Sequence, residues 1–347
     1  RLKGLFSAPI LFVGLAFAAA PPAMGQEAQS DASSANETLS VGELVAQVET
    51  AYKNRDWLTL EKATAAIEDT IDKNNFWAGM TPTEKNNTYM NLAIWYGDAA
   101  RETARYPKAI YEYQQALEIL EERDKPTAEY PATLGKLALV YRDTGKLEKA
   151  LEFFEKGQKI GEPIFGAQSI DNATALGNVA LTLQSLGQYD RAGQVMEKAI
   201  DIYEKTAGLN HPYTGLAYNN YALIAQSSGD YVRAEEQFRK AIAVIEKTVG
   251  RNHEYAAAAY SGLAVVINET GRPYEAEPLA RQALTSWNIS KGPDHPQTFT
   301  ALSNLAFILV TQNRNEDAIQ YLERALAGNR KVYGDNHHFS ALFSSNL

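Results

Sequence analysis

Residues 179–192 read VALTLQSLGQYDRA, and the pattern returns 42 residues later as YALIAQSSGDYVRA and again as LAVVINETGRPYEA at 263–276. Each copy has an alanine after an apolar residue, a glycine seven residues later, and a second alanine five residues after that glycine. Several columns that keep one period indicate a repeat architecture. The anchor alanines are Ala93, Ala138, Ala180, Ala222, Ala264 and Ala306, and the second alanines are Ala150, Ala192, Ala234, Ala276 and Ala318.

These columns are what a stack of helix hairpins requires. Alanines fit where two helices cross, because a larger side chain there would overpack the crossing by about 1–3 kcal/mol. The glycine, replaced by Asn313 in the last repeat, ends the first helix because it tolerates the left-handed conformation of a C-cap. A single hairpin cannot bury all its apolar surface, so neighbouring hairpins must stack. We predict an all-α, right-handed solenoid of antiparallel helix hairpins over residues 86–347, about six repeats plus the start of another.

The two ends of this array depart from the pattern. Ala93 lies 45 residues before the next anchor, so we expect extra residues between the first repeat's helices around Asp98 to Arg105, where the turn glycine is also missing. Residues 39–75 read as a degenerate helical hairpin that caps the array. Asn346-Leu347 repeats Asn304-Leu305 after 42 residues. We therefore expect the natural protein to continue past this point.

The N-terminus has the plan of a secretory signal peptide. Arg1 and Lys3 precede an uncharged, mainly apolar run from Leu5 to Ala20, and Ala23-Met24-Gly25 supplies small residues for a signal peptidase. This run is short for a membrane span. We predict a signal peptide at residues 1–25 cleaved after Gly25, a flexible linker at 26–38, and a bacterial protein that is periplasmic or secreted. An uncleaved signal is the one route to membrane attachment that the sequence leaves open.

Composition narrows the function classes. The net charge is -9 with no basic stripe in the repeats, which argues against a nucleic-acid partner because phosphate binding needs clustered cations. The chain has no cysteine, which excludes disulfides, thiolate metal sites and a cysteine nucleophile. No phosphate loop or nucleophile-elbow motif is present. We expect a protein that is not an enzyme, with no cofactor and no small-molecule substrate.

The histidines recur once per repeat and do not suggest a metal site. His211, His253, His295 and His337 occupy equivalent loop positions, so successive copies should lie about one repeat, roughly 20 Å, apart. They cannot share an ion. We expect the preceding residue in each loop to accept hydrogen bonds at the start of the next helix, with proline in the first turn where present. These predicted caps are Asn210, Asn252, Asp294 and Asn336.

The columns resemble the tetratricopeptide repeat. The 42-residue period and loops such as Gly208-Leu209-Asn210-His211-Pro212 are similar to the kinesin light chain class of these repeats. That resemblance implies a superhelix in which the first helices of successive repeats line a groove for extended peptides. It covers roughly residues 86–347 and implies a protein or peptide partner without naming it.

Mapped onto this chain, the implied groove has an aliphatic stripe flanked by amides. Side-chain amides both donate and accept hydrogen bonds, which suits capture of a peptide backbone. The aliphatic stripe fits packing against neighbouring helices equally well, whereas the amides have less reason to be buried. The predicted peptide-binding residues are Arg142, Asn178, Gln184, Asn219, Asn220, Gln226, Asn268 and Asn304.

Three functions remain open. The first is an exported, non-catalytic scaffold that binds peptides or proteins in the groove. The second is the regulatory region of a longer enzyme, such as a CHAT-type protease or a kinase, because repeats resembling these often precede such domains in bacteria. The third is self-association through an uncapped end of the array.

Overall fold

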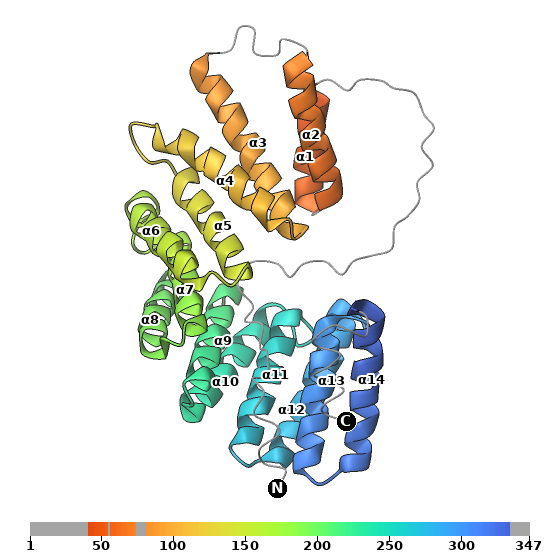
Figure 1. The fold of residues 1–347 in the computed structure, drawn as a ribbon. Coiled ribbons are helices and arrows are strands. Elements are labelled where there is room, and N and C mark those ends of the chain that lie inside the picture. Colours follow the sequence, from red (N-terminus) through yellow and green to blue (C-terminus); the bar gives the residue numbers. More distant parts are fainter. Residues whose placement is uncertain (1–40, 55, 74–80, 334–347) are drawn as a thin grey trace. The chain divides into compact units, whose positions relative to one another are not determined.

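The computed structural model describes residues 41–54, 56–73 and 81–333. Every regular element in these ranges is an α-helix, and consecutive helices pack against one another as hairpins (Figure 1). The predicted all-α stack of hairpins is confirmed. The predicted signal peptide, the linker at 26–38 and the start of a further repeat lie outside the described residues.

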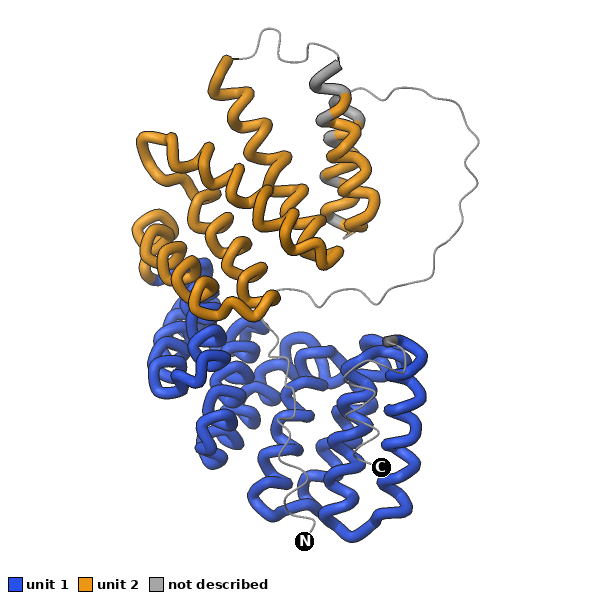
Figure 2. The backbone as a smooth tube through the Cα atoms, viewed as in Figure 1, with its two compact units in different colours: residues 1–19, 168–347 blue, residues 20–167 orange. Residues whose placement is uncertain are grey.

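The chain divides into two compact units between residues 167 and 168 (Figure 2). The helices of unit 2 are α1 (Val41–Asn54), α2 (Trp57–Lys73), α3 (Pro82–Glu102), α4 (Tyr106–Glu121), α5 (Glu129–Asp143) and α6 (Leu147–Phe165). Those of unit 1 are α7 (Ile170–Ser185), α8 (Tyr189–Thr206), α9 (Pro212–Ser227), α10 (Tyr231–Thr248), α11 (Glu254–Glu269), α12 (Pro273–Lys291), α13 (Pro296–Thr311) and α14 (Asn315–Tyr333).

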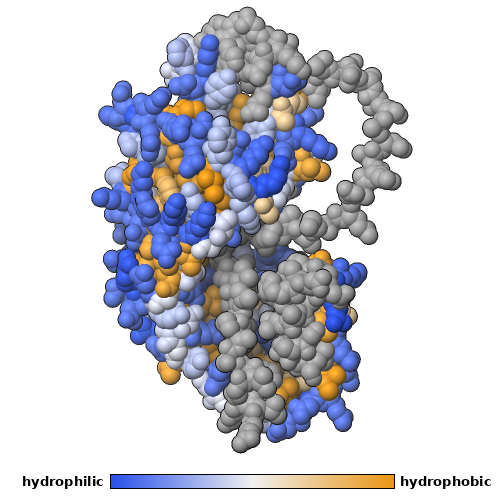
Figure 3. Space-filling view, viewed as in Figure 1, coloured by the Kyte–Doolittle hydropathy of each residue, from blue (hydrophilic) through white to orange (hydrophobic). Residues whose placement is uncertain are grey.

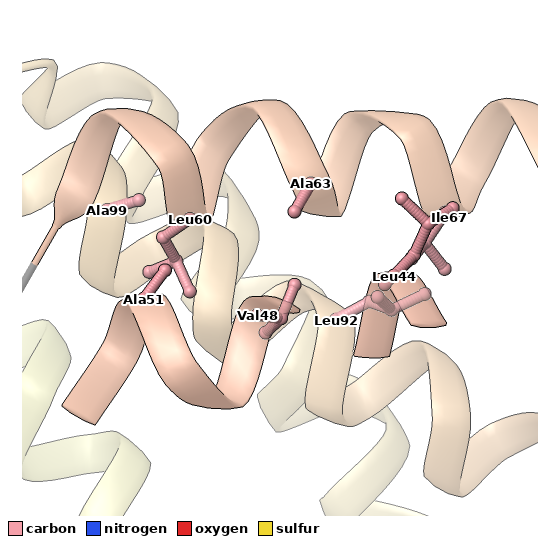
Figure 4. Packing of buried hydrophobic residues seen from close by; sticks show 8 residues of the cluster. All are labelled: Leu44, Val48, Ala51, Leu60, Ala63, Ile67, Leu92 and Ala99. Carbon is pink, nitrogen blue, oxygen red and sulfur yellow. The ribbon is translucent and has the colours of Figure 1, made fainter. Parts of the chain in front are cut away.

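The hairpin of α1 and α2 lies within the span predicted to cap the array. Its facing sides interdigitate through small and branched residues, with Val48 and Leu60 fully buried, and α3 closes the cluster (Figure 4). The other members of this apolar cluster are Leu44, Ala51, Ala63, Ile67, Leu92 and Ala99. The hairpin thus shares a core with the repeat that follows it.

The two alanine columns hold the hairpins of unit 1 together. The anchor alanines of α7, α9, α11 and α13 are fully buried, and the second alanines are at most 1% exposed. Met196 and Phe238, four residues after a second alanine, are also buried. Their burial confirms that these columns lie at the helix crossings. In α11 the approach is so close that an added Cβ on Gly262 would lie 2.2 Å from the ring of Phe238.

The turns between paired helices share one geometry. Gly187 has a φ of +73° and the equivalent Asn313 has +62°, both in the left-handed region. The N–H of the next residue then bonds back to the first helix, as from Gln188 to the carbonyl of Leu183 at 2.9 Å. This is the predicted C-cap.

The first repeat corrects our alignment. Ala104 has a φ of +57°, and Arg105 N–H donates to the carbonyl of Ala100, which reproduces the turn at Gly145. Ala104 lies 41 residues before Gly145, so the true anchor is Gly97 and not Ala93. The expectation of extra residues between the helices is therefore wrong. The additional length of this repeat lies at the start of α3, which has 21 residues where α5 has 15.

Within each unit, first helices of successive hairpins contact one another. Such contacts join α3 to α5 in unit 2, and α7 to α9, α9 to α11 and α11 to α13 in unit 1. We call each of these series a first-helix row. Ion pairs also join successive second helices. Arg272, just before α12, pairs with Glu235 of α10, and Arg314, just before α14, pairs with Glu277 of α12. The described helices present a largely hydrophilic surface in the view of Figure 3.

Candidate partner-binding surface

Three polar columns run along the first-helix rows. They lie three residues before, two residues before and four residues after each anchor alanine. In unit 1 they hold amides, small residues and Val310 but no charged residue. All seven amides predicted as peptide-binding residues belong to these columns of unit 1, and Arg142 occupies the last column in unit 2.

The amides are more buried than we expected. Asn220 is fully buried, and Asn219, Asn304 and Asn268 are between 2% and 7% exposed. Asn178, Gln184 and Gln226 are partly buried. The expectation that these side chains have little reason to be buried is therefore wrong for four of the seven. Column spacing shows which side of a helix a residue occupies, but not how closely the neighbouring elements approach it.

Two of the amides bond to the next first helix instead of facing outward. Gln184 Nε2 donates to the carbonyl of Leu223 at 3.0 Å and to Ser227 Oγ at 2.9 Å. Asn268 Oδ1 accepts from Thr311 Oγ1 at 2.7 Å. These bonds join α7 to α9 and α11 to α13. The bonds give Gln184 and Asn268 a structural role, because they hold successive first helices together.

The remaining amides have atoms without partners. Among the described residues, eleven buried side-chain nitrogen or oxygen atoms lack a hydrogen-bond partner, and eight of them lie in the three polar columns. Such an atom costs about 1–3 kcal/mol, so their concentration in three columns calls for an explanation. The eight atoms are Arg142 Nη1, Asn178 Oδ1, Asn219 Oδ1, Asn220 Oδ1 and Nδ2, Gln226 Oε1, Ser303 Oγ and Asn304 Nδ2.

Unit 2 carries charged residues in the equivalent columns. The guanidinium of Arg142 lies 5.8 Å from the ring centre of Phe154, a cation–π contact. Burial lowers the pKa of Arg142, Arg101 lowers it further, and Asp143 opposes this. Arg101, one repeat earlier, donates to Asp143 Oδ2 at 2.9 Å and to Glu102. Arg101 therefore has carboxylate partners within the protein, whereas Nη1 of Arg142 has no hydrogen-bond partner.

Sequence reasoning missed a buried ionic cluster in unit 2. Asp98 is 8% exposed and accepts hydrogen bonds from Tyr113 OH at 2.6 Å and from Lys136 Nζ. Lys136 Nζ also lies over the ring of Tyr52 at 5.9 Å. Burial, followed by the charge of Asp98, raises the pKa of Tyr113. The cluster joins α1, α3, α4 and α5. The 41-residue spacing of Ala104 and Gly145 would have revealed it by placing Asp98 in the first-helix row.

The histidines cap helices in unit 1. Nδ1 of His211 accepts the backbone N–H of Tyr213 at 3.2 Å. His253 and His295 make the same 3.2 Å bond to the residue two positions later. The prediction that Asn210, Asn252 and Asp294 are the caps is wrong, because each lies one position outside the N-cap. Pro212 and Pro296 do occupy the first turn. Asn336 and His337 lie outside the described residues.

Residues 41–54, 56–73 and 81–333 contain no group of three or more histidine, aspartate or glutamate side chains that could hold a metal ion. Nor does any helix within them have the length and apolarity needed to cross a bilayer.

Residues 88–162, 171–247 and 255–331 match the family model of the tetratricopeptide repeat. The chain belongs to the tetratricopeptide repeat family. This family is generally non-catalytic, and its solenoid is typical of protein-interaction scaffolds. The search of curated proteins gave no match.

Solved structures share the tetratricopeptide fold at low sequence identity. The apo form of RapI is 15% identical with a TM-score of 0.65, covering 85% of this chain and 99% of RapI. A Podosopora anserina protein with nearly identical TPR-like repeats of the kinesin light chain kind is 22% identical with a TM-score of 0.51, covering 60% and 98%. A Rap protein complexed with Competence and Sporulation Factor is 16% identical with a TM-score of 0.53, covering 89% and 97%.

Proposed function

We propose that this protein is an exported, non-catalytic scaffold that captures an extended peptide segment along the first-helix row of unit 1. The observation that supports this most directly is the set of unpaired amide and hydroxyl atoms in α7, α9 and α13. A peptide backbone offers one N–H donor and one carbonyl acceptor per residue. It can therefore complement both kinds of unpaired atom.

The chemistry of the columns favours a peptide ligand that is recognised through hydrogen bonds to its backbone. The three polar columns of unit 1 contain no charge, so they cannot select a peptide by ion pairing. Asparagine and glutamine can each donate and accept, which tolerates many sequences. The expected partner is thus an uncharged, extended stretch of protein.

Accessibility divides the predicted residues into two groups. Asn178, Gln184 and Gln226 keep part of their surface exposed. The unpaired Oδ1 of Asn178 and Oε1 of Gln226 are themselves buried, so a ligand reaches them after a small side-chain movement. Asn220 is fully buried, and engaging it requires neighbouring side chains to move aside. Side-chain rearrangement at an interface is common on binding.

The likeness to Rap proteins supports a solenoid that holds a partner. One of the Rap structures holds Competence and Sporulation Factor. The likeness extends to the fold, and we carry over only the idea that such a solenoid holds a bound factor. Export rests on the N-terminal sequence. It predicts a mature protein that begins at Gln26 in the periplasm or medium, which N-terminal sequencing of the fractionated protein would test.

Binding can be tested with an array of linear 12-residue peptides of varied sequence, probed with the purified protein. We expect a subset of uncharged peptides to bind. For the best of them, calorimetry should show about tenfold weaker binding to Asn178→Ala/Gln226→Ala, since two hydrogen bonds of about 0.5–1.5 kcal/mol each are lost. The melting temperature should stay within about 2 °C.

The matched control is Gln320→Ala, which removes an exposed amide from α14 on the second-helix side. It should bind the same peptide as tightly as the unaltered protein. Equal binding by the double variant, or an array on which only strongly charged peptides bind, would contradict the proposed site.

A further inference from the structure

Side-chain hydrogen bonds hold two pairs of successive first helices together in unit 1. Gln184 Nε2 of α7 donates to the carbonyl of Leu223 and to Ser227 Oγ in α9, at 3.0 and 2.9 Å. Thr311 Oγ1 of α13 donates to Asn268 Oδ1 of α11 at 2.7 Å. We call each of these connections a clasp. The clasps divide the row into two joined pairs, α7 with α9 and α11 with α13.

The junction between α9 and α11 has no clasp. Gln226 of α9 follows Gln184 by 42 residues, but its Oε1 is buried without a hydrogen-bond partner. In α11, Glu269 stands where α9 and α13 have a hydroxyl residue. An ionised carboxylate only accepts hydrogen bonds, so it cannot satisfy the oxygen of Gln226. Within the described part of the chain, no side-chain hydrogen bond crosses from α9 to α11.

The same two hairpins are tied together on the side of α10. Tyr260 OH of α11 donates to Glu246 of α10. Gly262 of α11 lies so close to α10 that an added Cβ would be 2.2 Å from the Phe238 ring. Because α9 and α10 form one hairpin, a rotation about the contact of α10 with α11 would separate α9 from α11. The contacts on the side of α10 would persist during this motion.

The helix α9 gains most from such an opening. It carries four of the seven unpaired atoms in the columns of unit 1, namely Asn219 Oδ1, Asn220 Oδ1 and Nδ2, and Gln226 Oε1. Asn219 precedes Gln226 by seven residues, two helical turns, so the two share a face of α9. Water that enters the opened junction would hydrogen-bond to this face and remove part of the cost of burial. At a clasped junction, opening would instead break bonds.

We propose that the first-helix row of unit 1 opens between α9 and α11 and that an extended peptide enters the row there. The entry of a peptide rests on the proposed function, whereas the opening is a property of the free protein. In the opened row, backbone groups of the peptide bond to Asn219 and Gln226 in place of the missing clasp. The clasped pairs on either side stay intact, so the row yields at one point only.

A single introduced thiol measures the opening, because the chain has no cysteine. Leu223 adjoins α7, whose Gln184 bonds to its carbonyl, and the equivalent Val265 adjoins α9 by the same repeat geometry. Their exposed fractions are similar, 6% and 3%. In the free full chain, Val265→Cys should react with dithionitrobenzoate about tenfold faster than Leu223→Cys, because no clasp has to break. Each rate is taken relative to that of the same variant unfolded in urea. Equal rates, or a faster Leu223→Cys, would overturn the proposal.

Installing the missing clasp gives a second readout. In the Val265→Cys protein, the further change Glu269→Ser supplies the hydroxyl that α9 has at this place. Labelling should slow about threefold or more as Gln226 gains a partner. Glu269→Ala is the matched control, since it removes the carboxylate without adding a hydroxyl, and it should leave the rate unchanged. If both changes slow labelling equally, or neither does, the absent clasp does not control the opening and the proposal is wrong.

A bound peptide tests the point of entry. At saturation, the best peptide from the array should slow the labelling of Val265→Cys about tenfold and that of Leu223→Cys less than about twofold, because only the first thiol lies at the entry point. A peptide that binds by calorimetry but protects neither thiol, or both equally, would contradict entry between α9 and α11. If no peptide on the array binds, the proposed function fails, and the labelling rates of the free protein still decide the opening.

Discussion

The first-helix rows of the two units occupy equivalent positions but treat their polar side chains in opposite ways. In unit 2, Asp98 is paired with Lys136 and Tyr113, and Arg101 is paired with Asp143. In unit 1 the columns are uncharged, and Asn220 has neither its donor nor its acceptor satisfied. The row of unit 2 satisfies most of its polar groups within the protein. In the row of unit 1, seven buried column atoms lack a partner, although Gln184 and Asn268 bond to the next first helix.

This difference assigns different roles to the two rows. A buried pair that is fully satisfied adds rigidity and specifies one arrangement of helices. Buried amides without partners lower stability, which a protein tolerates where function requires them. We therefore expect substitutions in the row of unit 2 to change folding and substitutions in that of unit 1 to change binding.

The largest effect should come from breaking the ion pair of unit 2. Lys136→Met leaves the carboxylate of Asp98 buried without a charge partner, and the free energy of unfolding should fall by about 3 kcal/mol. Urea denaturation followed by circular dichroism measures it. Removing both charges in Asp98→Leu/Lys136→Met should restore most of the loss, because no uncompensated charge remains.

The control for that prediction lies in unit 1. Lys205 pairs with Asp201 on the surface, where the two side chains are 62% and 53% exposed. Lys205→Met should cost less than about 0.5 kcal/mol. If it costs as much as Lys136→Met, burial of the pair is not what matters.

A glycine from each row gives a second comparison. Gly262→Ala in unit 1 puts a Cβ 2.2 Å from the Phe238 ring, so unfolding should become easier by about 1–3 kcal/mol. Gly135→Ala in unit 2 meets no atom within 4 Å and should stabilise α5 by about 0.5–1 kcal/mol. Thermal denaturation of both variants should show shifts of opposite sign. A shift of the same sign would mean that the packing around one of the glycines is misjudged.

The smallest effect concerns the turn of the first repeat. Ala104 holds a left-handed conformation that costs a non-glycine residue about 1–2 kcal/mol. Glycine removes this cost, but it also gives the unfolded chain more backbone entropy, which offsets part of the gain. Ala104→Gly should therefore stabilise the protein by about 0.5–1 kcal/mol. Gly145→Ala, at the equivalent turn, should destabilise it by a similar amount. Chemical denaturation would show whether the two changes mirror each other.

The repeat columns predicted the fold because each one depends on a local requirement. Ala180 must be small at a helix crossing, and Gly187 must adopt a left-handed turn, so both are visible in sequence. The first repeat misled us because Ala93 imitates the anchor while Gly97 and Ala104 replace the usual residues. The caps misled us because asparagine and aspartate are stronger N-cap residues than histidine.

The candidate site was harder to predict than the fold. Spacing brought Asn178, Asn220 and Asn304 into one column, and the structure does align them along one row. Spacing could not show that Asn220 is fully buried or that Gln184 reaches across to α9. Those facts depend on the distance between helices that are far apart in sequence.

The central claim is that five of the seven amides in the columns of unit 1 have side-chain atoms without a partner within the protein itself, and Asn220→Leu tests it most directly. Leucine has the same branched outline as asparagine, with larger methyl groups in place of the amide oxygen and nitrogen, and has no polar atom to satisfy. The free energy of unfolding, measured by urea denaturation, should rise by about 1–3 kcal/mol because the cost of two unsatisfied groups disappears. A fall of similar size would show that the free protein already satisfies this amide, and would contradict the account.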